Sequence, residues 1–198
     1  MARWRVRLAL CALFALGASA SGQGAHAASA RRVIYVQPLG KSLPAKDVAA
    51  VREALVAFTG LEVKILRRVA LPRAAWYGPR RRWRAEVLLD FLATRVPEDG
   101  KRILGLTGAD ISTTKGAVND WGVIGLANVD GSACVISSFR CRRRARSRRH
   151  ARIRLAKTAV HEIGHTLGLE HCPGRGCLME DALGKVVTTD GEYDLCPR

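Results

Sequence analysis

The sequence predicts an α/β fold: a single domain with a twisted, mixed and mostly parallel sheet, an antiparallel strand at its edge, and helices packed on it. Strand-like and helix-like segments alternate over residues 32–107, which is typical of parallel sheets because each strand returns through a helix. A stretch rich in glycine and strand-forming residues follows over residues 121–138 and indicates one or two edge strands joined by a hairpin. At 198 residues, the chain suits one domain with a sizeable core.

Each element can be placed from its own pattern. The expected strands are short runs of β-branched and other apolar residues at 32–36, 61–66 and 103–107. The expected helices have apolar residues at helical spacing and cover residues 46–58, 81–95 and 153–167. The first helix should end at Thr59-Gly60, and a loop over residues 71–79 should precede the second helix.

A stretch near the C-terminal end has a spacing that predicts a metal site, H-E-x-x-H-x-x-G-x-x-H. His161 and His165 are four residues apart, so on a helix both project from one face and can hold one ion. Gly168 can adopt the left-handed conformation that ends a helix and turns the chain, which would bring His171 to the same ion. Three protein ligands leave the fourth position of a zinc ion open for water, as in a catalytic site.

Glu162 follows the first of these histidines and would lie beside the zinc ion rather than on it. A zinc-bound water reacts near neutral pH, and Glu162 would accept its proton and pass it to a leaving amine. The predicted function is therefore hydrolysis of peptide bonds by a zinc metallopeptidase. An amphipathic core helix with incidental histidines would not explain why three of the five histidines of the chain fall within eleven positions.

Residues 1–30 have the composition of a cleaved secretory signal peptide, so we expect a mature domain over residues 31–198. Arginines at positions 3, 5 and 7 form a basic start, an apolar run follows over residues 8–18, and A-x-A cleavage sites come after it. An apolar run of this length is too short to span a bilayer. We therefore expect export to a periplasmic or extracellular location.

Basic residues are in large excess. The formal net charge is +16, and it is +13 without residues 1–30, which contain three arginines and no acidic residue. The excess gathers at residues 80–84 and, with nine arginines in fifteen residues, at Arg140–Arg154. The second cluster could bind an anionic polymer or a membrane surface, but no nucleic-acid-binding motif accompanies it. We favour the simpler interpretation of a solvated basic loop, and we expect a monomer.

Five cysteines would remain after removal of the signal segment, an odd number that leaves at least one thiol unpaired or bound to metal. Cys134 and Cys141 lie seven residues apart in a stretch expected to be a strand. Fully extended, they would stand roughly 23 Å apart, far beyond the reach of a disulfide. They can pair only if the chain turns between them.

The residues after the histidine motif resemble one known family. Cys172 follows the last histidine, Cys177 and Met179 come shortly after, and Cys196 lies nineteen residues beyond Cys177. Together with the long histidine motif, this pattern is similar to the archaemetzincin family of zinc metallopeptidases, in the metzincin clan. The similarity extends over most of the chain, about residues 32–196.

The resemblance implies a metzincin-like domain and a role for each matching residue. The positions of the catalytic zinc ligands are His161, His165 and His171. Glu162 matches the general base and acid, and Met179 matches the methionine of a turn beneath the metal. The edge-strand positions are Gly125, Leu126 and Ala127. We expect a peptide or protein substrate to bind there by adding itself to the sheet as an extra strand.

The resemblance also implies a second, structural zinc ion. Cys172, Cys177 and Cys196 match three of its four cysteine ligands, but the family pattern ends in C-x-x-C and this sequence has only the first cysteine of that pair. Cys134 or Cys141 could complete the site if the fold brings one of them close. In an oxidising compartment, a disulfide from Cys172 to Cys177 or to Cys196 is the alternative.

Two other functions are compatible with the sequence. One is an exported zinc-containing binding module whose arginine clusters bind an anionic polymer. The other is a catalytically inactive metzincin relative with a blocked pocket. The intact Glu162 favours catalysis, because a purely structural zinc site has no need of a base.

Overall fold

Residues 33–41, 43–191 and 194–196 are described by the structure, a computed structural model. Their central feature is a five-stranded sheet in the order β2-β1-β5-β9-β8. Its strands are β2 (Glu62–Ile65), β1 (Val33–Leu39), β5 (Gly100–Thr107), β9 (Ala133–Ser137) and β8 (Gly125–Ala127). The first four are parallel, and β8 runs antiparallel to β9 at the edge. The predicted α/β fold with an antiparallel edge strand is confirmed.

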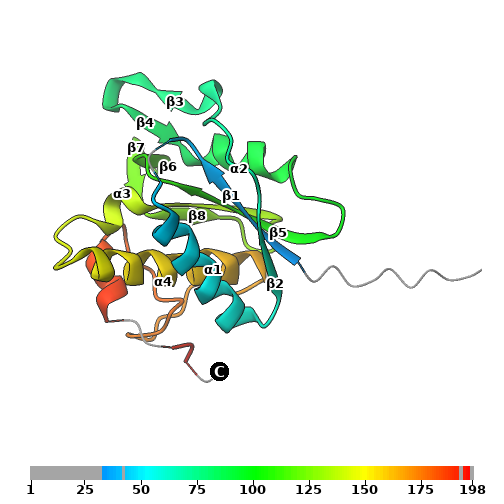
Figure 1. Ribbon diagram of the computed structural model, residues 1–198. Helices are drawn as coiled ribbons and strands as arrows, with labels where there is room; N and C mark the ends of the chain where they lie inside the picture. The colour runs from blue at the N-terminus through cyan, green and yellow to red at the C-terminus, as the bar shows by residue number, and fades with distance from the viewer. Residues whose placement is uncertain (1–32, 42, 192–193, 197–198) are drawn as a thin grey trace, which may run out of the picture.

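Helices cover both faces of this sheet (Figure 1). α1 (Ala45–Thr59) and α4 (Arg148–Thr166) pack on one face, and α2 (Ala85–Ala93) packs on the other. Alternate side chains of β1 serve the two layers: Ile34 and Val36 face α1 and α4, whereas Val33 and Tyr35 face the side of α2. The helix that carries the histidine motif is therefore fixed on the sheet by buried apolar contacts.

A second, smaller sheet is absent from the sequence-based prediction. It consists of β3 (Trp76–Tyr77), β4 (Arg82–Arg84), β6 (Ile111–Lys115) and β7 (Val118–Val123), in that order. The 3₁₀ helices η1 (Arg73–Ala75) and η2 (Gly78–Arg80) flank β3. The helix predicted over residues 81–95 begins only at Ala85, because the preceding residues pair with β3 and β6. Strands this short and polar have no periodicity by which to predict them.

The stretch 121–138 divides between the two sheets. β8 and β9 form the expected hairpin, and Asp130 in the turn between them has a φ of 57°. Residues 121–123 belong instead to β7, which pairs with β6. The chain thus passes from the smaller sheet directly into the edge strand of the larger one.

The prediction of a solvated basic loop over residues 140–154 is wrong at both ends. α4 begins at Arg148 rather than near residue 153, because the Ser147 side chain caps its N-terminus. Arg140 and Arg154 are buried in ion pairs with aspartates from distant segments. The arginines from 142 to 149 are exposed, as a solvated loop requires.

Two short elements complete the described fold, α3 (Ser138–Cys141) before α4 and η3 (Val186–Asp190) after it. Among the described residues, no helix has both the length and the apolar character needed to cross a bilayer. The expected signal segment, residues 1–30, lies outside the described residues and stays a prediction, as does the domain boundary after it.

Candidate functional site

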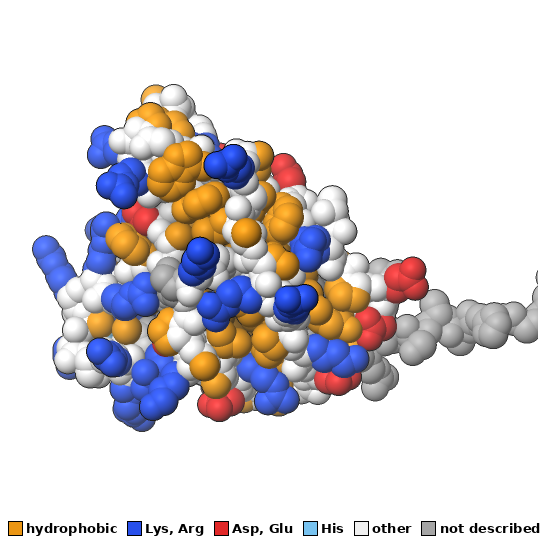
Figure 2. All heavy atoms as spheres, turned by 45° about the horizontal axis from the view of Figure 1, so that its top comes forward, with side chains coloured by type: hydrophobic (Ala, Val, Ile, Leu, Met, Phe, Trp, Pro, Cys, Tyr) orange, Lys and Arg blue, Asp and Glu red, His pale blue; other side chains and the backbone are white. Residues whose placement is uncertain are grey.

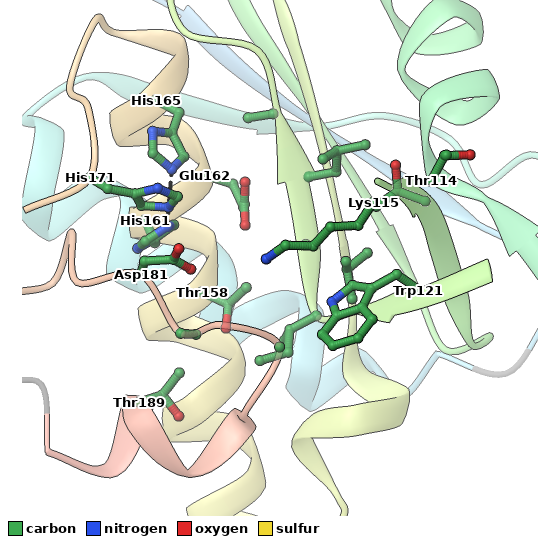
Figure 3. A pocket seen from close by; sticks show the side chains of 18 residues that line it. Thr114, Lys115, Trp121, Thr158, His161, Glu162, His165, His171, Asp181 and Thr189 are labelled. Carbon is green, nitrogen blue, oxygen red and sulfur yellow. Dashed lines mark hydrogen bonds between the residues drawn. The ribbon is translucent and has the colours of Figure 1, made fainter. Parts of the chain in front are cut away.

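Helix α4 carries the first two histidines of the motif. His161 and His165 project from it toward one point, and His171 reaches the same point from the loop beyond the helix (Figure 3). Gly168 has a φ of 94°, the positive value expected where the chain turns back. One ring nitrogen of each histidine lies within 4.8 Å of the others. The structure thus brings the three sequence-predicted ligands together.

Backbone carbonyls orient two of the three rings. His161 Nδ1 lies 2.7 Å from the carbonyl oxygen of Leu178. His165 Nδ1 lies 2.7 Å from the carbonyl oxygen of Leu169. Because a carbonyl oxygen only accepts, each Nδ1 carries the proton and each Nε2 has a lone pair. These two Nε2 atoms are 3.0 Å apart.

The histidine group fits a zinc ion. Two facing lone pairs at that distance repel each other, and a cation bound by both removes the repulsion. Burial lowers the pKa of His161 to about 4 and also lowers the pKa of His165, so both rings are neutral, as metal binding requires. Three imidazole nitrogens form a donor set typical of catalytic zinc.

Glu162 lies beside the histidines and against β8. Its side chain is 7% exposed, and burial raises the pKa of its carboxyl group to about 8. Gly125 permits the close approach of strand and helix, because an ideal Cβ atom there would lie 2.7 Å from Glu162 Cδ. A carboxyl group in this place can take up and release a proton next to the metal-binding nitrogens.

A pocket of about 310 Å³ lies between these groups and the edge of the sheet. Its walls come from the β6–β7 hairpin, β8, α4 and residues 181–189 (Figure 3). The three edge-strand positions that the sequence predicts, Gly125, Leu126 and Ala127, all line it. In the described part of the chain β8 is an edge strand that pairs with β9, so its other side can offer backbone groups to an extended peptide.

Met179 and three cysteines lie next to the histidine group. Met179 is buried against α4 at Gly164, where a Cβ atom would come within 2.8 Å of its Sδ atom. The sulfur atoms of Cys172, Cys177 and Cys196 lie within 4.8 Å of one another. The Cys172 backbone N–H donates to the Met179 carbonyl at 2.8 Å, which ties this sulfur group to the segment that follows His171.

The other two cysteines do not join the sulfur group. Cys134 in β9 and Cys141 in α3 are unpaired and buried in the core between the sheet and α4. The chain turns between them, but they do not form the disulfide that a turn would permit. Burial raises the pKa of both thiols, that of Cys141 to about 12, so both are protonated. Among the described residues, neither supplies a fourth ligand.

Several residues that line the pocket were not predicted from the sequence. They are Lys115, Trp121, Thr158, Asp181 and Thr189. Thr158 could have been found, because it lies one helical turn before Glu162 on the same face of α4. The others come from the β6–β7 hairpin and the last loop, for which the sequence has no periodic pattern.

In this α/β domain, one helix and the loop after it bring three imidazoles and a buried glutamate to the edge of the sheet. This arrangement is typical of a zinc metallopeptidase. Comparison with known proteins agrees. The model of peptidase family M54 matches residues 52–188. Archaemetzincin from Haloarcula marismortui is 38% identical over 125 residues, which are 60% of this chain and 69% of that protein. Archaemetzincin from Archaeoglobus fulgidus is 36% identical over 146 residues, 74% of this chain and 82% of that protein.

Solved structures show the same relationship. The crystal structure of archaemetzincin from Archaeoglobus fulgidus, complexed with malonate, has a TM-score of 0.69 and 31% identity, over 83% of this chain and 95% of that one. That from Methanopyrus kandleri has a TM-score of 0.72 and 28% identity, over 86% of this chain and 92% of that one. The chain belongs to peptidase family M54, the archaemetzincins. It is therefore a zinc metallopeptidase, and both its histidine group and its cysteine group could hold zinc.

Proposed function

We propose that His161, His165 and His171 hold a catalytic zinc ion and that Glu162 acts as general base and then general acid in peptide hydrolysis. The observation that carries this proposal is the convergence of two lone-pair Nε2 atoms at 3.0 Å, with a buried carboxyl group beside them. When bound, zinc would supply an acidified water and a positive charge facing the scissile carbonyl.

Each part of the site has its own task. The carbonyls of Leu178 and Leu169 keep the Nε2 atoms directed at the shared point. Glu162 accepts the proton of the attacking water and releases it to the leaving amine, and its pKa, raised by burial to about 8, suits this exchange near neutral pH. The free side of β8 pairs with the backbone of an extended peptide.

The decisive variant is Glu162→Gln, which keeps the shape of the side chain. We expect it to retain zinc, measured by metal analysis, and to lose peptide hydrolysis by roughly 10²-fold or more. Glu53→Gln on the exposed side of α1 is the matched control and should be fully active. Full activity of Glu162→Gln would refute the assigned base. Bound zinc with no cleavage of any peptide library by the unaltered protein would indicate an inactive relative.

Export of the protein is a second proposal. It is supported by the basic start, the apolar run over residues 8–18 and the A-x-A sites of residues 1–30. Expression of the full chain in a bacterium, followed by cell fractionation and N-terminal sequencing, should recover protein outside the cytoplasm that begins near residue 31. A full-length protein confined to the cytoplasm would contradict export.

A third proposal concerns the exposed arginines at positions 142, 143, 144, 146, 148 and 149. Figure 2 shows Lys and Arg side chains on the side of the molecule where Figure 1 places α3 and the start of α4. We propose that these six arginines attract an anionic polymer or membrane surface. Arg140 and Arg154 do not take part, because both form ion pairs with aspartates. Binding to heparin should weaken steeply with salt, and Gln at positions 146, 148 and 149 should reduce it. Salt-independent retention would contradict this role.

A further inference from the structure

The pocket has a positively charged side opposite the histidines. Lys115 at the end of β6 and Trp121 in β7 both line it. Figure 3 shows the Lys115 side chain extending from the hairpin into the pocket, with its ammonium group directed toward the side that carries Glu162 and the histidines. The ammonium nitrogen lies 5.5 Å from the centre of the Trp121 ring, a cation–π contact that favours this position of the exposed lysine.

Trp121 joins the hairpin to the last loop. An ideal Cβ atom at Gly184 would lie 3.0 Å from Trp121 Nε1, and Gly184 has a φ of 74°. The indole therefore packs directly on the backbone of the loop. Hairpin and loop form one continuous wall, and Lys115 stands on that wall facing the catalytic groups across the pocket.

Charge is distributed unequally among the residues that line the pocket. Lys115 is the only lysine or arginine among them, and the acidic residues are Glu162 and Asp181. The Asp181 carboxylate already accepts a hydrogen bond from the Leu183 backbone N–H at 2.8 Å. Within the described part of the chain, Lys115 has no ion pair, and its ammonium group lies over the Trp121 ring. A lysine on a pocket wall that forms no ion pair of its own can receive an anionic group of a ligand.

We propose that Lys115 is a specificity-determining residue that receives a carboxylate of the peptide substrate. Carboxylate is the common anionic group of an unmodified peptide, and it occurs at the C-terminus and on Asp and Glu side chains. A volume of about 310 Å³ is in the range of ligand-binding pockets, so it can hold a substrate residue next to a scissile bond at the histidines. The inference rests on the proposed peptidase function, because it assigns the substrate class of that same site.

The test compares four peptides that share one sequence. They end in a free carboxylate or an amide, and they carry Glu or Gln at one internal position. The unaltered protein should cleave a carboxylate-bearing peptide with a kcat/KM about five-fold above its neutral partner, as expected for a partly exposed ion pair. The free-acid and Glu arms show which carboxylate is recognised. Added salt should reduce the preference.

Substitution of Lys115 separates recognition from structure. Lys115→Met should bring the ratio of charged to neutral peptides near one, and Lys115→Glu should invert it. Lys46→Glu, at an exposed position in α1 outside the pocket, makes the same change in net charge and should keep the preference. An equal ratio in the unaltered protein, or an unchanged ratio in both Lys115 variants, would overturn the inference.

Binding provides a readout that does not need turnover. Isothermal titration of Glu162→Gln with the same four peptides should show tighter binding of the carboxylate-bearing ones, lost when Lys115→Met is added. If the unaltered protein cleaves no peptide, the proposed function fails, whereas the binding preference still decides the role of Lys115. Equal binding of charged and neutral peptides would refute that role.

Discussion

Arg154 and Asp190 form a two-point ion pair that fastens a wall of the pocket to helix α4. Arg154 Nε lies 2.7 Å from Asp190 Oδ1, and Nη2 lies 2.7 Å from Oδ2. Arg154 is 2% exposed, and its Nη1 also donates to the Arg143 carbonyl at 2.8 Å. One guanidinium therefore holds the start of α4, the loop before it and η3. Thr189, the neighbour of Asp190, lines the pocket.

Loss of Asp190 should destabilise the fold. Asp190→Ala leaves the buried Arg154 charge without its carboxylate partner; because Asp190 itself is exposed, we expect a cost of about 1–3 kcal/mol. Urea unfolding should show this loss, whereas Asp90→Ala at an exposed position in α2 should change the free energy of unfolding by less than about 0.5 kcal/mol. Equal effects of the two variants would show that the ion pair contributes little.

The Arg154–Asp190 ion pair should make the free energy of unfolding depend on pH. Hydrogen bonds from Arg154, and then from His150, hold the pKa of Asp190 well below its usual range. A carboxyl group with a lower pKa in the folded state stabilises the fold above its unfolded pKa of about 3.9, and this contribution is lost as pH falls further. Between pH 6 and pH 2, the urea midpoint of the unaltered protein should fall more steeply than that of Asp190→Asn. Parallel curves would contradict this role.

Local spacing accounts for the parts of the site that sequence analysis predicted correctly. Helical periodicity alone places His161 and His165 on one face, and the glycine after them needs only its own backbone freedom to return the chain. The order of strands and helices likewise follows from short-range patterns, which is why the mostly parallel sheet could be predicted.

Pairing between distant segments explains what sequence analysis missed. Arg154 and Asp190 are 36 residues apart, and Arg140 and Asp110 are 30 apart. The sequence of an arginine run is the same whether its side chains are solvated or paired with a carboxylate from a distant segment. The sequence therefore predicts the basic loop but not the two ion pairs at its ends. Lys115 was missed for the same reason, since β6 is defined by its pairing with β4 and β7.

A methyl group at position 125 should impair catalysis more than stability. In Gly125→Ala the added Cβ atom overlaps the Glu162 carboxyl group, so the glutamate must move away from the histidines. A displacement of about 1 Å can cost roughly 10²-fold in rate, whereas overpacking costs about 1–3 kcal/mol in stability. Gly78→Ala, whose Cβ atom would have its nearest neighbour at 3.7 Å, is the control. Unchanged kcat/KM in Gly125→Ala would mean that Glu162 has room to adapt.

Metal removal should lower the melting temperature. A ligand that binds only the folded state stabilises it by about 2.7 kcal/mol at one hundred times its Kd, and the converging Nε2 atoms exist only when α4 is formed. Dialysis against a chelator should therefore lower Tm, and added zinc should restore it. In His161→Ala the zinc-dependent shift should be smaller. An identical shift in that variant would place the stabilising ion outside the histidine group.

The cysteine group should bind zinc as thiolates rather than form a disulfide. Backbone N–H groups point at its sulfur atoms: Gly174 N lies 3.2 Å from Cys172 Sγ, and Cys196 N lies 3.4 Å from Cys177 Sγ. Such donors stabilise thiolates, and three clustered thiolates require a cation. Metal analysis should give two zinc ions per chain, and thiol titration should detect these cysteines only after chelation. Cys177→Ser should lose one zinc ion, whereas Cys141→Ser, whose buried thiol lies outside the group, should keep both. One zinc ion per chain with a single titratable thiol among the three would instead establish a disulfide.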